Sequence, residues 1–284
     1  MKPVAPADFL AGMARSSAAR SAAAQAIESP AALAARVRAL PPAPGLRLDG
    51  RFDLIAELKL RSPAQGLLGT DAHDLEARVA RYARGGAAIV SVLTEPDRFD
   101  GRLAHLARAS VALAPFGVPA MRKDFLVDRY QLLEARAAGA GGVLLIVRML
   151  ERARIEELVG YAAELGLFVV LEAFDVADIA VATELVSTWR GVADACLVGV
   201  NSRDLVTLQV VPERLEALAP ELPAGVPRVA ESGLVTAADA ARLAAAGFTV
   251  ALVGTALMSA EDPEQLVRDM IRSGRDCAAS RVRR

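Results

Sequence analysis

The sequence has very few cysteine and histidine residues. Its 284 residues include two cysteines, Cys196 and Cys277, and two histidines, His73 and His105. Two cysteines far apart in so long a chain do not make a disulfide framework, so we expect a reducing, cytoplasmic compartment. Neither histidine lies in a cluster with metal-ligand spacing, which argues against a zinc site or a Ser–His–Asp triad. We therefore expect no metal and no cofactor, and we place both histidines in solvated helices.

Net charge and long apolar runs are also missing. The 33 basic side chains nearly balance the 34 acidic ones, which leaves a formal charge of −1. A nucleic-acid partner would need a concentrated basic face, and this charge balance argues against one, so we expect no nucleic-acid partner. No apolar run approaches the roughly 18 residues of a spanning helix, so we expect a soluble chain with no membrane partner. Hydrophobic residues make up 54 % of the sequence, and we expect one large domain of roughly 250 residues with short additions.

Lysine is the third scarce residue, and its positions are informative. Only Lys2, Lys59 and Lys123 are lysines among the 33 basic residues, and all the others are arginine. The pKa of an ammonium group can be tuned for proton transfer, whereas a guanidinium stays protonated. Lys2 is terminal and carries no such implication. Chance could explain why Lys59 and Lys123 are lysines, so their location in the fold must decide whether they have a function.

From about residue 53 the chain alternates between short apolar runs and amphipathic segments of helical period. The expected strands are 53–59, 87–93, 118–124, 141–147, 168–174, 196–202, 227–233 and 248–254. They start roughly 22–33 residues apart, the size of one βα unit. Eight parallel strands favour an α/β fold of the (β/α)8 TIM-barrel type, with a doubly wound sheet as the alternative. The G-x-G-x-x-G turn of a dinucleotide-binding fold is missing after the first strand.

The two ends of the chain differ from this repeating region. Phe9, Leu10 and Met13 share one face of a helix, and Pro41, Pro42 and Pro44 mark a linker before the first strand. We expect this helix to pack against the main domain. The expected division is an N-terminal helical extension and linker at 1–50, the catalytic barrel at 51–274, and a flexible tail at 275–284.

Polar and charged residues stand at the carboxyl ends of the predicted strands, where such barrels locate their chemistry. They are Glu57 and Lys59, Lys123, Glu172, Asn201, Glu231 and Ser232. Burying a charged side chain inside an apolar strand costs free energy, so such a residue is expected to be paired with an opposite charge or to take part in the chemistry. Internal Lys–Glu pairs that only neutralise each other would explain one pair, but not readily two lysines and three glutamates at the same end. The set is typical of general acid–base chemistry on a small anionic substrate.

Two glycines, Gly233 and Gly254, follow the last two predicted strands, in AESGL (230–234) and VGTALM (253–258). The loops after strands seven and eight of such barrels commonly bind phosphate through backbone N–H groups and a helix N-terminus. One such glycine would usually mark a turn, but two in consecutive units favour a phosphorylated substrate.

With their flanking segments, these residues resemble the indole-3-glycerol phosphate synthase family over residues 50–272. The combination of E-x-K, MRKDF and NSRDL is specific to that family, whereas AESG occurs in other phosphate-binding barrels. The matching segments are AELKLRSPAQG (56–66), SVLTEPDRFDG (91–101), MRKDFLVDRYQLLEARAAGA (121–140), LEAF, VNSRDL, VAESGL and LVGTALM. The resemblance implies that 1-(2-carboxyphenylamino)-1-deoxyribulose 5-phosphate is converted to indole-3-glycerol phosphate, carbon dioxide and water, a decarboxylase step of tryptophan biosynthesis.

The resemblance also implies roles for individual residues. Lys123 would be the general acid at the ketone, and Glu172 the general base of the dehydration, with Lys59 and Glu57 assisting proton transfer. Asn201, Glu231 and Ser232 would position the substrate, and Arg203 would support the side of the site that these residues form. Gly233, Gly254 and Thr255, with Lys59, would hold the phosphate, Ser62 would lie on the first loop, and Phe99, Phe125 and Leu144 would line the anthranilate pocket.

Some positions depart from the family pattern, and several alternatives stay open. The first loop reads SPAQG where SPS-x-G is common, Arg102 stands where serine is frequent, and Thr255 stands where glutamate is common. A catalytically silent barrel acting as a partner subunit would generally lack the acid or the base. A phosphoribosylanthranilate isomerase would need a cysteine in the first strand, while a Schiff-base aldolase is harder to exclude. A specialised indole pathway, and the choice between monomer and homodimer, also remain open.

Overall fold

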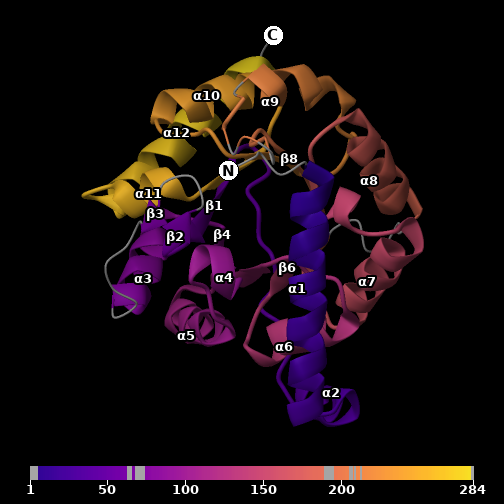
Figure 1. Ribbon diagram of the computed structural model, residues 1–284. Helices are drawn as coiled ribbons and strands as arrows, with labels where there is room; N and C mark the ends of the chain where they lie inside the picture. The colour runs from indigo at the N-terminus through magenta and orange to yellow at the C-terminus, as the bar shows by residue number, and fades with distance from the viewer. Residues whose placement is uncertain are drawn as a thin grey trace.

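Eight parallel strands close into one barrel at the centre of the molecule (Figure 1). The computed structural model describes residues 6–62, 66–67, 74–188, 195–204, 207, 209–211 and 213–282. The barrel strands are β1 (Asp53–Leu58), β4 (Ile89–Leu93), β5 (Ala120–Lys123), β6 (Gly142–Ile146), β7 (Phe168–Ala173), β8 (Cys196–Asn201), β9 (Arg228–Glu231) and β10 (Val250–Val253). Because β10 pairs with β1, the sheet has no free edge. The predicted (β/α)8 barrel is confirmed, and an open doubly wound sheet is excluded.

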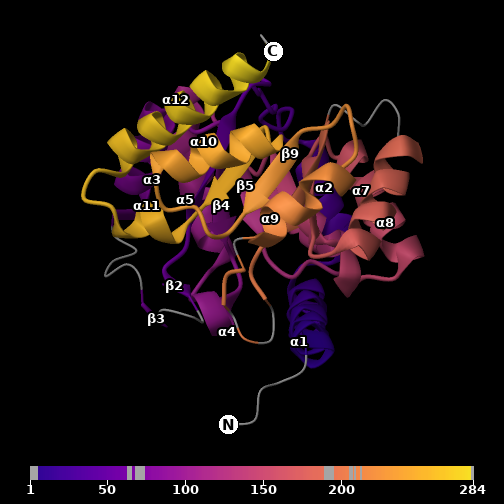
Figure 2. The same ribbon diagram turned by 90° about the horizontal axis from the view of Figure 1, so that it is seen from above.

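Helices between the strands form an outer ring around this barrel (Figures 1 and 2). They are α3 (Leu75–Gly85), α5 (Leu103–Leu113), α6 (Arg129–Ala137), α7 (Arg152–Glu164), α8 (Val176–Thr188), α9 (Glu213–Leu218), α10 (Ala237–Ala246) and α12 (Pro263–Val282). The loops also contain the hairpin of β2 (Arg61–Ser62) and β3 (Gly66–Leu67), the helices α4 (Pro96–Phe99) and α11 (Thr255–Ser259), and the 3-10 turns η2 (Ala114–Phe116), η3 (Val147–Met149) and η5 (Ala219–Glu221). Glycines end some of these helices: Gly86 and Gly247 follow α3 and α10 with φ of 99° and 102°.

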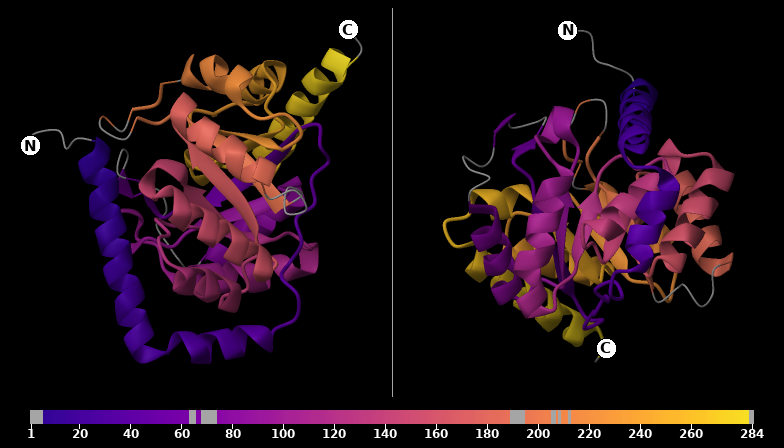
Figure 3. Two further views of the ribbon diagram at one scale, coloured as in Figure 1. Left: turned by 90° about the vertical axis from the view of Figure 1, so that its right-hand side faces the viewer. Right: turned by 90° about the horizontal axis from the view of Figure 1, so that it is seen from below.

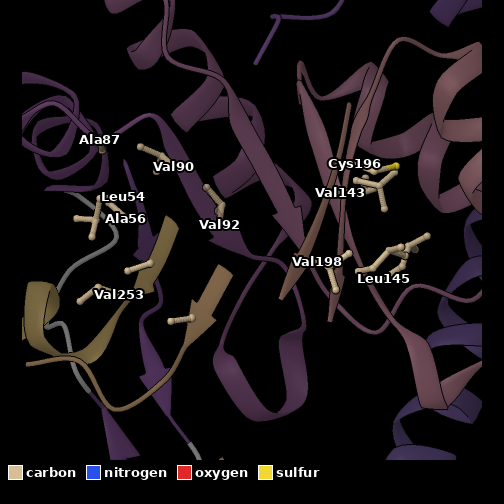
Figure 4. Packing of buried hydrophobic residues seen from close by; sticks show 14 of the residues in the cluster. Leu54, Ala56, Ala87, Val90, Val92, Val143, Leu145, Cys196, Val198 and Val253 are labelled. Atoms are coloured by element: carbon tan, nitrogen blue, oxygen red, sulfur yellow. The ribbon is translucent and has the colours of Figure 1, made fainter. Parts of the chain in front are cut away.

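Each strand buries both of its faces, and this produces two separate apolar layers. Side chains such as Leu54, Val92 and Leu145 point outward and pack under the helices (Figure 4). The alternate side chains, among them Ile55 and Leu144, fill the barrel interior. The interior is therefore a packed core, and only the ends of the barrel are available for chemistry.

The N-terminal extension forms two helices, α1 (Pro6–Ile27) and α2 (Pro30–Arg38). In the left panel of Figure 3, α1 lies along one end of the barrel, α2 runs along its side, and the following segment leads to the opposite end, where β1 begins. Leu10 and Met13 are buried against the barrel-interior cluster. The expectation that this helix packs on the main domain is therefore confirmed.

Two regions differ from what the sequence suggested. Residues 275–282, expected to belong to a flexible tail, continue α12 as helix, and Arg275 donates to Asp53 Oδ1 at 2.7 Å. His105 is buried on α5 with a relative exposure of 8 %, so its placement as a solvated residue is wrong. It lies on the same helix face as Leu106 and Ala109, and burial, reinforced by neighbouring arginines, lowers the pKa of its imidazole. His73 lies outside the described residues.

Across the described parts of the chain, no helix is both long and apolar enough to cross a bilayer.

Candidate active site

The parallel strands bring their charged carboxyl ends to one mouth of the barrel. Glu57, Lys123, Glu172, Asn201 and Glu231 lie within or at the ends of β1, β5, β7, β8 and β9, and Lys59 follows β1 directly. All six line one cavity of about 420 Å³. Chain segments more than a hundred residues apart therefore contribute to a single site.

Lys123 is the centre of this group. Its Nζ lies 2.8 Å from Glu172 Oε2 and 3.2 Å from Glu231 Oε2. Asn201 Nδ2 donates to the other Glu172 oxygen at 3.0 Å, and the backbone N–H of Arg203 donates to Asn201 Oδ1 at 2.9 Å. The lysine side chain keeps 17 % of its surface exposed, whereas the two glutamates keep 4 % and 1 %. The ammonium thus points into the cavity from a buried acidic setting.

This setting fixes the direction of two pKa shifts. Burial by itself lowers the pKa of Lys123, but the charges of Glu172, Glu231 and Glu57 outweigh burial and raise that pKa. Burial raises the pKa of Glu231 to about 8, and Glu172 adds to this while Lys123 opposes it. Lys123 is therefore a charged ammonium near neutral pH, and Glu231 holds a proton far more readily than an ordinary carboxyl group.

Two glycines make room for the inward-pointing carboxylates. A methyl group built on Gly199 would lie 2.3 Å from Glu231 Oε1, and one built on Gly254 would lie 2.2 Å from Glu57 Oε1 and 3.0 Å from Lys59 Nζ. Any larger residue would displace these charged groups. Glu231 Oε1 has no hydrogen-bond partner among the described residues. The role of Gly199 was not predicted, because only the fold shows that it faces a glutamate on the next strand.

A second group of polar atoms forms one corner of the cavity. Lys59 Nζ lies 2.9 Å from Glu57 Oε1 beside Gly254. Burial raises the pKa of Glu57, but Lys59, Lys123 and Arg203 together outweigh it and lower that pKa. Ser232 and Gly233 have φ of 70° and 82°, so the chain turns sharply after β9. These residues, with Thr255 at the start of α11, line the same cavity. A lysine and two turns after strands form an arrangement that suits an anion.

Much of the remaining cavity lining is apolar. Phe99, Phe125 and Leu144 line the cavity, as the sequence suggested, and the rings of Phe99 and Phe125 are 6.4 Å apart. Phe9 of α1 also lines it and meets Phe125 edge to face at 6.0 Å. Sequence reasoning placed Phe9 on a packing helix but could not say that the helix crosses the mouth. The remaining apolar lining was also missed: Leu93, Ile146, Val210, Leu234, Val235, Leu252, Val253 and Ala256.

Every candidate site residue except Ser62 lines this cavity. Ser62 pairs with Gly66 in the β2–β3 hairpin, and its side chain lies outside what the structure describes. Arg203 is half-buried beside the site, and burial lowers its guanidinium pKa against the opposing charge of Glu57. Within the described residues, no group of three or more His, Cys, Asp or Glu side chains is arranged to hold a metal ion.

Hydrogen bonds and an ion pair join α1 to the segment that follows Lys123. Arg20 donates to both carboxylate oxygens of Asp124, at 2.9 and 3.2 Å, and Thr94 donates to Asp124 at 2.7 Å. Asp124 is fully buried at its side chain. Burial raises its pKa, but the charges of Arg122 and Arg20 and the bonds from Arg20 and Thr94 outweigh that effect and lower the pKa to about 2. Gln131 donates to Ser17 at 2.7 Å in the same interface. The N-terminal helix is thus bonded to the segment that carries the central lysine.

The chain is similar in sequence to one family of known proteins over most of its length. The family model described as indole-3-glycerol phosphate synthase matches residues 14–270. The indole-3-glycerol phosphate synthase of Nocardioides sp. is 42 % identical over 265 residues, which are 93 % of this chain and 96 % of that protein. The enzyme of the same name from Parafrankia sp. is 43 % identical over 224 residues, 79 % of either chain.

Solved structures show the fold more distantly. A thiamine phosphate pyrophosphorylase from Pyrococcus furiosus matches with a TM-score of 0.57 at 15 % identity, covering 80 % of this chain and 98 % of that one. An orotidine 5'-phosphate decarboxylase from Pyrococcus horikoshii matches with a TM-score of 0.56 at 15 % identity, covering 78 % of this chain and 99 % of that one. At such identity the likeness concerns the barrel alone.

Proposed function

The chain belongs to the indole-3-glycerol phosphate synthase family, and we propose that the charged groups at its barrel mouth divide that family's reaction among an acid, a base and an anion site. The protein is a carboxy-lyase of tryptophan biosynthesis. Its substrate, 1-(2-carboxyphenylamino)-1-deoxyribulose 5-phosphate, yields indole-3-glycerol phosphate, carbon dioxide and water. Because the carboxylate leaves as neutral carbon dioxide, the reaction takes up one proton overall.

Lys123 would supply the first proton. The aromatic carbon that bears the carboxylate attacks the ketone carbon, and negative charge develops on the ketone oxygen. That oxygen becomes far more basic than the ketone, so a charged ammonium in contact with it can give up its proton at this stage. Loss of carbon dioxide then returns an electron pair to the ring and restores its aromaticity. The raised pKa of Lys123 supports this role, because it keeps the proton in place until the substrate needs it.

Glu172 would complete the reaction as the base. Dehydration removes a proton from the carbon next to nitrogen and a hydroxide from the former ketone carbon, which leaves as water after protonation. Glu172 Oε2 lies 2.8 Å from Lys123 Nζ, so a proton taken by the glutamate can return to the lysine that gave one away. Lys59 and Glu57 would assist the protonation of the leaving hydroxyl. This contact between the acid and the base is the observation that carries the proposal.

The remaining residues would hold the substrate in this orientation. Gly233, Gly254, Thr255 and Lys59 would bind the phosphate, while Phe99, Phe125 and Leu144 would bind the anthranilate ring. Asn201, Glu231 and Ser232 would contact the sugar portion, and Arg203 would support this wall. Ser62 would act from the first loop. With the two ends fixed, the reacting atoms are brought together beside Lys123, which lowers the entropic part of the barrier.

We further propose a cytoplasmic enzyme that works as a monomer or homodimer without a metal or organic cofactor. Cys196 and Cys277 are both free thiols, which suits a reducing compartment. A catalytically silent paralogue is disfavoured, because both the acid and base positions are filled and joined. Among the described residues, the charged groups at the mouth already include proton donors and acceptors for every step.

The test is direct. Purified protein with excess EDTA is mixed with the substrate, and indole-3-glycerol phosphate fluorescence and released carbon dioxide are both followed. We expect equal amounts of the two products, with inorganic phosphate as a competitive inhibitor. The Lys123→Met variant is the control for a contaminating enzyme. Absence of turnover, or turnover that EDTA abolishes, would contradict the proposal, and sedimentation of the same sample decides between one and two copies.

A further inference from the structure

The short helix α11 separates the anion corner from the outer helix α3. Its residues Thr255, Ala256 and Ser259 line the cavity, whereas Leu257 and Met258 are buried on the other side. The position of α11 therefore sets the shape of the cavity wall at its polar corner. What holds α11 from behind must also influence that wall.

Arg78, on α3, contacts α11 from behind. Its Nη1 donates to the carbonyl oxygens of Leu257 and Met258 at 3.2 and 3.4 Å. The last carbonyls of a helix have no partner within the helix, so they need donors from elsewhere. Tyr82, one turn further along α3, is buried with its hydroxyl 3.4 Å from Met258 Sδ.

A continuous series of bonds connects Arg78 with the cavity. Arg78 binds the carbonyl of Met258, and the N–H of Met258 donates to the carbonyl of Gly254 at 2.9 Å. Gly254 in turn lies against Glu57 and Lys59 so closely that a methyl group would not fit. A shift of α11 would therefore move Gly254 and change its spacing from the Lys59 ammonium.

We propose that Arg78 is a positioning residue for the phosphate of the substrate, acting through α11. The inference rests on the proposed phosphate site at Gly233, Gly254 and Lys59. Arg78 does not line the cavity, so it influences the phosphate only through the helix. Lys123 and Glu172 are held by β5 and β7, not by α11. Loss of Arg78 should therefore weaken phosphate binding and leave proton transfer unchanged.

The experiment compares Arg78→Met, Arg78→Lys and the control Arg84→Met. Arg84 is also on α3, but it pairs with Glu264 of α12 at 2.9 Å and serves as a matched loss of one helix–helix bond. For each variant, KM and kcat are measured, with the inhibition constants of inorganic phosphate and of anthranilate as a phosphate-free probe. We expect Arg78→Met to raise KM and the phosphate inhibition constant about fivefold to tenfold. This is the effect of losing one or two hydrogen bonds between the shifted cavity wall and the phosphate. The kcat and the anthranilate constant should stay within about twofold of wild type, because only binding of one end is lost.

Arg78→Lys should recover part of the phosphate affinity, since an ammonium can also donate to these carbonyls. If Arg78→Met does not fold, the test rests on Arg78→Lys alone. A phosphate inhibition constant of Arg78→Lys equal to that of Arg84→Met then overturns the inference. Equal losses for phosphate and anthranilate would mean a general structural role and would also overturn it. If phosphate does not inhibit the wild-type enzyme, the proposed phosphate site itself fails. A wild type that phosphate inhibits, with Arg78 variants unchanged, refutes only the role of Arg78.

Discussion

Lys123 Nζ and Glu172 Oε2 are 2.8 Å apart, although 49 residues separate them in the chain and strand β6 lies between their strands. The barrel curvature brings the two inward-facing side chains together. This contact joins a proton donor and a proton acceptor in one cavity, and it allows both to be restored after each turnover.

Glu172→Gln should fold normally and lose most of its turnover. The amide has nearly the same shape but cannot accept a proton, so dehydration loses its base. We expect kcat to fall by roughly 10²- to 10⁴-fold, with a smaller change in KM. The control is Glu184→Gln on the exposed outer surface of α8, which should leave kcat unchanged. A Glu172→Gln enzyme with nearly wild-type kcat would remove this residue from the mechanism.

Glu231 should make the stability of the protein fall as the solution becomes basic. Its pKa is about 8 in the folded protein, above the ordinary value of 4.5. A group with a raised folded-state pKa contributes stability that is complete below the unfolded pKa and is lost as pH rises through the folded pKa. Glu231→Gln mimics the protonated form, so the stability of the variant relative to wild type should increase between pH 5 and pH 9. Urea unfolding at several pH values measures this, and a constant difference would show that Glu231 does not titrate in that range.

Arg20→Met should destabilise the protein by roughly 2 kcal/mol at neutral pH, because it removes one of the two arginines bonded to the buried Asp124 carboxylate, while Arg122 stays 3.2 Å from it. The loss should shrink as pH falls from 4 to 2. Asp124 has a pKa depressed to about 2, and such a group loses its stabilising effect as pH falls through that value. Arg15→Met, at an exposed position on the same helix, is the control. Unfolding free energies that are equal for both variants would show that the Arg20–Asp124 pair does not anchor α1.

Phe9→Ala should weaken substrate binding with little effect on the chemical step. The Phe9 ring lines the apolar part of the cavity and packs edge to face on Phe125. Its loss removes apolar contact with the aromatic end of the substrate, which is worth roughly 1 to 2 kcal/mol, or about a tenfold rise in KM. Phe9→Leu should recover part of the effect. An unchanged KM would mean that α1 supports the barrel but does not contact the substrate.

The sequence predicted the barrel and the site because both follow from local patterns. Eight apolar runs predicted eight parallel strands, and parallel strands place their ends together, so Glu57, Lys123 and Glu172 could be grouped before the fold was known. Packing details could not be predicted in this way. The space that Gly199 leaves for Glu231 and the bond from Arg20 to Asp124 depend on which segments face each other.

The direction of the Lys123 pKa shift also needed the structure. From the sequence alone, burial could lower that pKa and nearby carboxylates could raise it. The separations of 2.8 and 3.2 Å from Glu172 and Glu231 in the folded chain decide in favour of the carboxylates. His105 shows the same limit, because helical periodicity alone does not say which face of α5 is buried.

The most direct measurement is kcat of Lys123→Arg, with its thermal unfolding recorded on the same sample. Arginine keeps a positive charge beside Glu172 and Glu231 but does not release a proton near neutral pH. If Lys123 is the proton donor for ring closure, the variant unfolds near the wild-type temperature and loses at least roughly 10²-fold in kcat. A folded Lys123→Arg enzyme that turns over at a rate comparable to wild type would contradict that assignment.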